Sequence, residues 1–349
     1  MSETEDVLLE TRGALGRIRL NRPKAINSLS LPMIHAIESA LNRFESDPAI
    51  GLVLVSGEGE RGLCAGGDIR VLYENGRERM ADSLAFFRDE YRMNAHIARY
   101  PKPYAAVMDG ITMGGGVGIS AHGRVRIVTE RTKMAMPETG IGFFPDVGGT
   151  WLLSRAPGEI GTFMGLTGEA FGGADAIYAG LADFFVPSET LPALIEALAA
   201  LPASATVTQA SEITKKFAQT VPAPLAAQRE EIDRVFASDD VEEIIAALRA
   251  AGTPFAAETL KIMDRKCPRS MKVTLRLLRL ARRDTTLEQS LQREFDAVHA
   301  VLASDDFYEG VRAAVVDKDR NPKWSPATLH AVTAAMVEEF IRPAGEVIF

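Results

Sequence analysis

Two apolar segments of this sequence each lead into a glycine-rich turn and then into a helical pattern. Residues 50–55 (IGLVLV) precede GEGERGLCAGGD, and residues 103–108 (PYAAVM) precede DGITMGGGVG. An apolar run without polar alternation is typical of a strand covered on both faces, as in a parallel sheet. Because strand, loop and helix alternate in this way, the sequence predicts an α/β domain whose functional loops lie at the strand ends.

Turn and capping signals predict further strands and helices along the chain. The pair Arg12 and Gly13 lies between two short apolar runs and predicts a hairpin. Ser30 can cap a helix that continues to Asp47, because apolar residues recur between them at helical spacing. Further strands are expected over 7–10, 16–20 and 125–129, and a further helix over 80–100.

The character of the chain changes after about Val186, where alanine and leucine recur at helical spacing. Helices are expected over 191–201, 241–251 and 287–302, with prolines marking the breaks between them. We therefore expect an α/β core over residues 1–190. A mainly helical C-terminal region over residues 191–349 would cover the site or form contacts in a possible homo-oligomer.

Composition narrows the class of protein and its compartment. The net charge of −8 argues against a nucleic-acid partner, because phosphate binding needs concentrated lysine and arginine. The two cysteines, Cys64 and Cys267, indicate neither a disulfide framework nor a metal site. The N-terminus lacks the pattern of a signal peptide, and no apolar stretch reaches the ~18 residues of a membrane span. We expect a cytoplasmic protein with no membrane partner.

The two glycine-rich turns can present backbone amides to a ligand, because glycine has no side chain to shield its N–H group. Taken alone, such turns are most often ordinary tight turns. A dinucleotide-binding turn fits poorly, because the spacing is not GxGxxG, and no Gly-Lys-Ser/Thr follows to make a phosphate loop. Two amides, one from each turn, would suit an oxyanion hole for a polarised carbonyl.

The stretch MAMPETGIGFFPDVGG (134–149) places Glu138 and Asp146 in apolar, glycine-rich surroundings. A carboxylate removed from water tends to keep its proton, so this placement suggests an acid or base beside the carbonyl. An alternative is purely structural: Glu138 could cap the next turn, and Asp146 could cap a helix opening at Val147. No GxSxG motif is present, and the five histidines are scattered.

These motifs resemble those of the crotonase (enoyl-CoA hydratase/isomerase) superfamily. The resemblance rests on GLCAGGDIR, FFRDEY, GITMGGGVGISAHG, AMPETGIGFFPDVGGTWLL and DDFYEGVRAAVVDKDRNPKW, spread over residues 7–340. It implies a crotonase-like core of repeated ββα units and an acyl-CoA substrate. No separate cofactor is implied, because coenzyme A is part of that substrate.

The resemblance also implies roles for individual residues. The amides of Gly67 and Gly115 would hold the thioester oxygen, and Glu138 would be the catalytic glutamate. Asp146 would be the acid that distinguishes a hydrolase branch of the superfamily. The positions implied for substrate binding are Lys24, Ala25, Ala65, Asp68 and Glu90.

One departure from the hydratase pattern points to the reaction. Hydratases of this superfamily use two glutamates, and the first falls just after the triple glycine, where this chain has Gly118. The resemblance therefore favours hydrolysis of a short 3-hydroxyacyl-CoA, with 3-hydroxyisobutyryl-CoA as the expected substrate and valine degradation as the setting. Glu138 would attack the carbonyl or activate a water. The alternatives are an enoyl-CoA hydratase or isomerase, and an inactive acyl-CoA-binding subunit.

Overall fold

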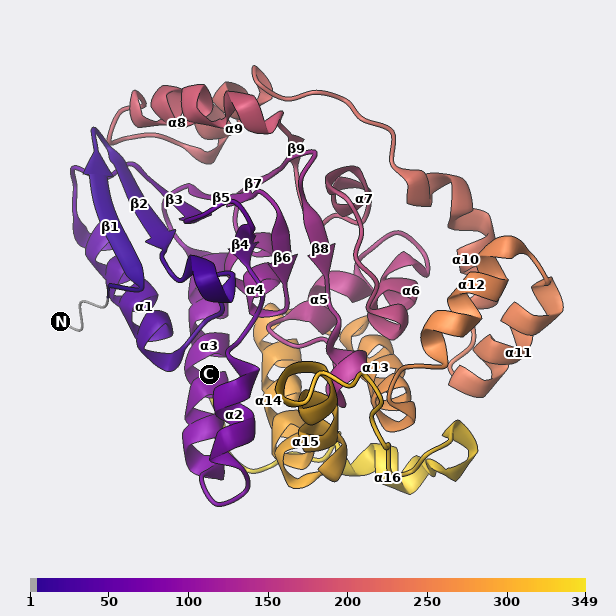
Figure 1. The fold of residues 1–349 in the computed structure, drawn as a ribbon. Coiled ribbons are helices and arrows are strands. Elements are labelled where there is room, and N and C mark those ends of the chain that lie inside the picture. The colour runs from indigo at the N-terminus through magenta and orange to yellow at the C-terminus, as the bar shows by residue number, and fades with distance from the viewer. Residues whose placement is uncertain (1–4) are drawn as a thin grey trace. The chain divides into compact units, whose positions relative to one another are not determined.

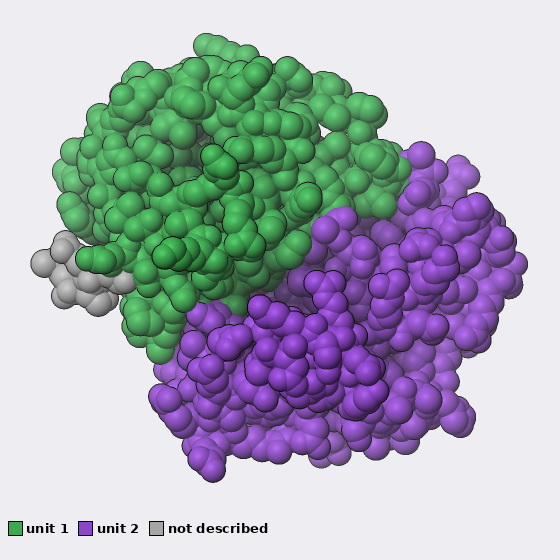
Figure 2. All heavy atoms as spheres, viewed as in Figure 1, with its two compact units in different colours: residues 1–67, 92–134, 171–226 green, residues 68–91, 135–170, 227–349 purple. Residues whose placement is uncertain are grey.

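The computed structural model describes residues 5–349, which fall into two compact units (Figure 2). Unit 1 contains the residues up to 67 together with 92–134 and 171–226. Unit 2 contains residues 68–91, 135–170 and 227–349. Each unit is therefore assembled from three separate stretches of the chain.

Unit 1 is built on strands, as the apolar runs predict. Over the described residues, one sheet has the order β1-β2-β3-β5-β7-β9 and a smaller one has the order β4-β6-β8 (Figure 1). The strands of the larger sheet are β1 (Val7–Arg12), β2 (Leu15–Leu20), β3 (Leu52–Gly57), β5 (Tyr104–Met108), β7 (Val125–Val128) and β9 (Phe184–Phe185). Those of the smaller sheet are β4 (Gly62–Cys64), β6 (Ile111–Met113) and β8 (Lys133–Ala135), whose last residue belongs to unit 2.

The repeated ββα units are confirmed. In each of the pairs β3–β4, β5–β6 and β7–β8, the first strand joins the larger sheet, the second joins the smaller sheet, and a helix follows. The predicted hairpin is also confirmed, because β1 and β2 pair antiparallel around Gly13, whose φ is +57°. The remaining neighbours in the larger sheet are parallel.

Helices of unit 1 cover the larger sheet. Leu194 and Leu198 of α8 (Leu191–Ala199) and Ala210 of α9 (Val207–Lys215) belong to one buried apolar cluster with Leu52 and Leu54 of β3. These two helices therefore close one face of the larger sheet (Figure 1). Phe44 of α1 lies against Gly16 of β2, where a Cβ atom would come within 2.8 Å of the ring. The helices and 3-10 turns of this unit are η1 (Pro23–Ala25), α1 (Leu31–Ser46), α4 (Gly115–Ala121), α7 (Gly173–Tyr178), η3 (Ser188–Thr190), α8 (Leu191–Ala199) and α9 (Val207–Lys215). The chain enters unit 2 through η4 (Pro224–Gln228), and α3 (Met80–Arg99) has residues in both units.

Local signals set the boundaries of α1 and β3. Ser30 caps α1 by accepting a hydrogen bond from the Met33 N–H at 3.4 Å, as predicted. The strand expected to start at Ile50 starts instead at Leu52. The reason is that the Ile50 N–H donates to the Asp47 carbonyl at 3.1 Å and closes the turn after α1.

The short strands β4 and β6 were missed by the sequence patterns, which predicted loops there. Three residues are too few to show a period. A Cβ atom at Gly62 would lie 2.2 Å from the Ile111 nitrogen, and one at Gly116 would lie 2.5 Å from the Cys64 carbonyl oxygen. Several glycines of the two turns are therefore required by close packing between backbones.

Unit 2 is helical, and α13 is its central element. Its buried side chains include Met271, Leu275 and Leu278, and it packs against α5, α6, α14 and α16. The helices of unit 2 are α2 (Ile69–Asn75), α5 (Gly149–Ser154), α6 (Ile160–Thr167), α10 (Arg229–Val235), α11 (Val241–Ala251), α12 (Pro254–Met263), α13 (Pro268–Ala281), α14 (Leu287–Ala303), α15 (Asp305–Val311) and α16 (Ala334–Glu339). Its shorter turns are the 3-10 segments η2 (Glu138–Ile141) and η6 (Leu329–Ala331) and the π turn η5 (Arg312–Val316). Within residues 5–349, no helix has the length and apolar content needed to cross a bilayer.

Gly142 offers a direct test of the packing inside unit 2. It ends η2 with φ of +74°, and a Cβ atom there would lie 2.2 Å from the Asp306 carbonyl oxygen of α15. Gly252 ends α11 with a similar φ of +62° but has no atom within 4 Å of that position. We expect Gly252→Ala to cost about 1–2 kcal/mol of unfolding free energy through backbone strain alone.

Gly142→Ala should cost several kcal/mol more, because one of the two packed backbones must move. Urea unfolding of both variants measures the difference. Equal losses for the two variants would contradict the close approach of η2 and α15.

Candidate active site

Four carboxyl groups gather inside unit 2, each almost wholly removed from solvent. Glu90 lies on α3, Glu138 opens η2, Asp146 lies in the turn before α5, and Glu294 lies on α14. None of the four is more than 6% exposed. Glu90 Oε1 and Glu138 Oε2 have no hydrogen-bond partner. Buried carboxyl atoms without partners are costly, so this cluster is a candidate site for chemistry.

Aromatic side chains provide the apolar surroundings of this cluster. Phe143, between Glu138 and Asp146 in the sequence, stacks on Phe87 and Phe144 with ring centroids 5.4 and 4.7 Å away. The ring of Phe307 lies 5.7 Å from that of Phe143. These rings leave the neighbouring carboxyl groups with little access to water.

The electrostatics of the cluster follow from this burial. Burial raises the pKa of Asp146 to about 7 and that of Glu294 to about 8. The pKa values of Glu90 and Glu138 lie well above the ordinary range, first because of burial and next because of the negative charge of Asp146. Like charges at this density cannot all be ionised, so the four groups share at least one proton at neutral pH.

Tyr91 is a neighbour of the cluster that the sequence analysis missed. Its hydroxyl donates a hydrogen bond of 2.8 Å to Asp146 Oδ2. Burial raises the pKa of Tyr91, and the charge of Asp146 raises it further, so Tyr91 stays a neutral donor. This bond favours the ionised form of Asp146 and opposes the effect of burial. The only sequence signal for Tyr91 was its position next to Glu90 in FFRDEY.

Glu294 was also missed, although the sequence carries a signal for it. The buried residues Leu287, Leu291 and Val298 mark the apolar face of α14, and Glu294 falls at the same helical spacing. A glutamate on the apolar face of a helix needs a buried partner. Its partners are the backbone amides of Gly148 and Thr150, which follow Asp146 in the chain.

The structural alternatives for Glu138 and Asp146 are wrong. The helix after Asp146 begins at Gly149 with Gly148 as its N-cap, and the Asp146 side chain accepts from Tyr91 instead. Glu138 is the first residue of η2, whose N-cap is Pro137 and has no side-chain capping bond. Neither carboxylate is explained by helix capping.

Unit 1 brings together the residues implied for the oxyanion hole. Gly67 follows β4, and Gly115 is the first residue of α4, so its N–H has no acceptor within that helix. A Cβ atom at Gly66 would lie 3.7 Å from the Gly115 nitrogen, so the two turns approach closely. Leu29 forms a bridge with Gly67 and donates its N–H to the Gly66 carbonyl at 2.8 Å.

The loop that carries Lys24 and Ala25 lies beside the first of these turns. The Ala65 N–H donates to the Ile26 carbonyl at 2.9 Å. Asn27, which the sequence analysis missed, fixes the loop from its buried position by donating to the Glu58 and Gly62 carbonyls at 3.0 and 3.1 Å. Lys24 itself is exposed, so its side chain is accessible to a charged ligand.

Asp68 is the first residue of unit 2 in the chain. It is the N-cap of α2, and its carbonyl accepts from the Val71 N–H at 3.0 Å. Its expected contact with substrate stays a prediction.

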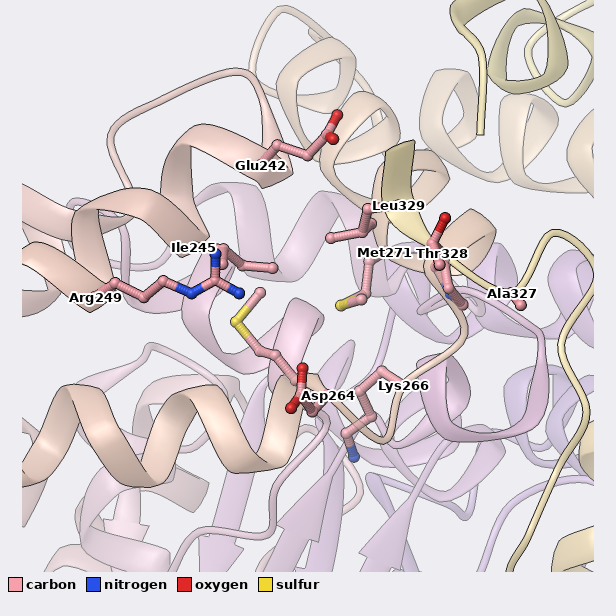
Figure 3. Close-up of a pocket in the computed structure, with 11 residues that line it drawn as sticks. Glu242, Ile245, Arg249, Asp264, Lys266, Met271, Ala327, Thr328 and Leu329 are labelled. Atoms are coloured by element: carbon pink, nitrogen blue, oxygen red, sulfur yellow. The ribbon is translucent and has the colours of Figure 1, made fainter. Parts of the chain in front are cut away.

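A pocket of about 410 Å³ lies elsewhere in unit 2 (Figure 3). Arg249, Asp264 and Lys266 are among its lining residues, together with apolar side chains such as Met271. Burial lowers the pKa of Lys266, and the attraction of Glu138 is the smallest of the opposing effects. The residues that line this pocket include none of the four clustered carboxyl groups, so the candidate site for chemistry is the cluster and not this pocket.

Comparison with known proteins identifies the class to which this fold and these residues belong. A family model described as enoyl-CoA hydratase/isomerase matches residues 15–341. The chain belongs to this family, and the crotonase-like core with a helical C-terminal region is confirmed.

Individual relatives cover nearly the whole chain. The mitochondrial 3-hydroxyisobutyryl-CoA hydrolase of Rattus norvegicus is 43% identical over 99% of this chain and 90% of its own length. The Homo sapiens protein of the same name is 42% identical, over 98% of this chain and 89% of its own. A crystal structure titled carnitinyl-CoA dehydratase from Mycobacterium thermoresistibile has a TM-score of 0.94 and 47% identity, with 99% of both chains covered. One titled enoyl-CoA hydratase from Rhodobacter sphaeroides has a TM-score of 0.90 and 42% identity, with 98% of both covered.

The hydrogen bond from Tyr91 generates a prediction about pH and stability. A carboxyl group whose pKa is raised by folding stabilises the protein at acid pH, and that contribution is lost as the pH rises through the folded pKa. For Asp146 the window runs from its ordinary value of 3.8 to about 7. Tyr91→Phe removes the bond that lowers this pKa, so the part of the fall in unfolding free energy that Asp146 causes should extend further above pH 7 than in the unmodified protein, by roughly 1.4 kcal/mol for each pKa unit.

Tyr100→Phe is the matched control, because it removes a buried hydroxyl that donates to the Leu41 carbonyl at 2.8 Å just after the same helix. Its stability should stop falling at the same pH as in the unmodified protein. Urea unfolding across this pH range measures all three proteins. Superimposable pH profiles for Tyr91→Phe and the unmodified protein would contradict the account.

Proposed function

We propose that the protein hydrolyses a short 3-hydroxyacyl-CoA thioester, with 3-hydroxyisobutyryl-CoA as its preferred substrate. The products would be 3-hydroxyisobutyrate and coenzyme A. The observation that carries the proposal is the buried Glu138, with one unpartnered carboxyl oxygen and a raised pKa beside Asp146. The names of the relatives that match almost the whole chain support the same reaction.

In this proposal, unit 1 supplies the amides that stabilise charge on the thioester oxygen. The N–H groups of Gly67 and Gly115 bind that oxygen as the carbonyl carbon becomes tetrahedral. Removal of one such donor from an enzyme costs ~3 kcal/mol of transition-state stabilisation. The exposed Lys24 would meet the nucleotide part of coenzyme A, and Ala25 and Ala65 would line its path.

Unit 2 supplies the proton chemistry of the proposed reaction. In its ionised form, Glu138 either attacks the carbonyl carbon or takes a proton from an attacking water. Attack by Glu138 breaks the C–S bond and leaves a mixed anhydride, which water then hydrolyses to release the acid and free Glu138. Attack by water breaks the C–S bond and releases the acid directly. The departing thiolate needs a proton, which a set of carboxyl groups that already shares protons can deliver. Asp146 orients the substrate hydroxyl, the water or the thiolate, and Glu90 contacts the acyl group. Asp68 is proposed as a further substrate contact.

A hydratase or isomerase activity is the second candidate, because similar solved structures carry the titles dehydratase and hydratase. Addition of water to a double bond in the usual manner of this superfamily uses two glutamates. Gly118 stands where the first of them is expected, and it cannot transfer a proton. The third candidate, an inactive acyl-CoA-binding subunit, is disfavoured by the intact Glu138.

The setting of the reaction is part of the proposal. Valine degradation would follow if the branched hydroxyacyl ester is the preferred substrate. A reducing compartment such as the cytoplasm is supported by the two buried cysteines, Cys64 and Cys267, which form no disulfide within the described residues. We also propose that the reaction needs no separate cofactor, and that residues 191–349 cover the site or contribute to a homo-oligomer.

The proposal predicts which substrate is consumed and which variant fails. The unmodified protein should release free thiol from 3-hydroxyisobutyryl-CoA with a higher kcat/KM than it shows for loss of the enoyl absorbance of crotonyl-CoA. Glu138→Gln should lower kcat for thiol release by at least about 10³-fold, because the side chain can no longer accept a proton or attack. Acyl-CoA binding, measured by calorimetry, should persist.

Glu169→Gln is the matched control for this variant. Glu169 is an exposed glutamate of the same unit, and its carboxyl group lies 3.8 Å from Lys266 Nζ. It should turn over like the unmodified protein. A Glu138→Gln protein that keeps most of its thiol release would overturn the assignment. Faster consumption of crotonyl-CoA than of the hydroxyacyl ester would favour the hydratase.

A further inference from the structure

Glu294 is the one member of the carboxyl cluster to which the proposed reaction assigns no role. It is fully buried on the apolar face of α14, between Leu291 and Val298. A glutamate in such a position requires strong hydrogen-bond donors, since water cannot reach it.

All of its donors come from one short segment. The Gly148 N–H donates to Glu294 Oε2 at 2.7 Å, and the Thr150 N–H donates to Oε1 at 3.0 Å. The Thr150 hydroxyl also donates to Oε1. Both oxygens of the carboxylate are therefore occupied, and every donor lies within four residues of Asp146.

The segment between Asp146 and Thr150 has an unfavourable backbone conformation. Val147 has φ of +53°, in the left-handed region that β-branched residues avoid, and Gly148 follows with φ of +76°. The Gly149 N–H closes the turn on the Asp146 carbonyl at 2.6 Å. Such a turn persists only where its surroundings hold it, and the bonds to Glu294 do so.

The direction of the Asp146 side chain depends on this turn. With the turn in place, Asp146 Oδ2 meets the Tyr91 hydroxyl, and Asp146 acts electrostatically on both Glu90 and Glu138. Relaxation of Val147 to an ordinary φ would rotate the chain that carries Asp146. Glu294 thus acts on the site through backbone amides and does not need to touch substrate.

We infer that Glu294 is a positioning residue for the proposed hydrolysis, because its carboxylate fixes the strained turn that aims Asp146 within the carboxyl cluster. The inference rests on the proposed function. The ionised carboxylate is the side chain that fits, since both of its oxygens accept, and the three hydrogen bonds that converge on it favour this form against the effect of burial. A glutamine of the same shape presents an NH₂ group to one of these donors and loses that bond.

Glu294→Gln tests the inference through the separation of kcat from KM. We expect kcat for thiol release from 3-hydroxyisobutyryl-CoA to fall by about 100-fold, the effect of a small displacement of a catalytic group. KM should change much less, because no group that binds coenzyme A is altered. Glu288→Gln, which removes a glutamate from the first turn of the same helix, should keep the unmodified kcat.

A second pair of variants keeps the test valid if Glu294→Gln folds poorly. Thr150→Val removes one of the three donors and should lower kcat by about tenfold, as expected for loss of a single supporting hydrogen bond. Thr150→Ser keeps the hydroxyl and should restore kcat. Circular dichroism melts establish the folded fraction to which each kcat refers.

The outcomes separate this inference from the proposed function. An unmodified protein that releases no thiol overturns the proposed function, and this inference with it. An active unmodified protein whose folded Glu294→Gln variant keeps its kcat overturns the positioning role alone. Equal kcat values for Thr150→Val and Thr150→Ser would also overturn the positioning role of Glu294. A purely structural role would lower the melting temperature and leave kcat of the folded fraction unchanged.

Discussion

Repulsion among four carboxyl groups in an apolar interior is the constraint on which the chemistry of unit 2 depends. Glu90, Glu138, Asp146 and Glu294 are withdrawn from water, and the negative charge of Asp146 raises the pKa of each of the other three. In such surroundings each further negative charge costs more than the last. The cluster must therefore hold a shared proton near neutral pH, and a shared proton can be accepted and returned within one catalytic cycle.

The surrounding structure keeps these groups together in spite of that repulsion. The stacked ring of Phe143 excludes water, and the close fit of Gly142 against α15 fixes the turn that begins at Glu138. Hydrogen bonds from Tyr91 to Asp146, and from backbone amides to Glu294, favour charge on those two groups. Glu138 Oε2, in contrast, accepts no hydrogen bond from the described residues, so this oxygen remains available for reaction.

Much of the fold and part of the candidate site could be predicted from the sequence, and the features that could not be predicted have physical causes. The cap at Ser30 and the boundaries of α11 are local properties of the chain, so periodicity and capping predicted them. Burial at 138–146 was predicted from apolar neighbours, whereas catalytic roles came from a family resemblance. The role of Glu294 depends on residues 144 positions away and on the backbone angle of Val147, which no local pattern reveals. The three-residue strands were missed because they are too short to show a period.

Titration of the carboxyl carbons by ¹³C NMR, in protein labelled at the side chains of aspartate and glutamate, tests the shared proton most directly. The account predicts carboxyl groups that titrate as a coupled set, with Asp146 near 7 and Glu294 near 8. In Asp146→Asn, the titration near 7 should disappear and those of Glu90, Glu138 and Glu294 should move to lower pH, because the negative charge that raises their pKa values has been removed. Complete ionisation of every carboxyl group by about pH 5, as in exposed side chains, would contradict the account.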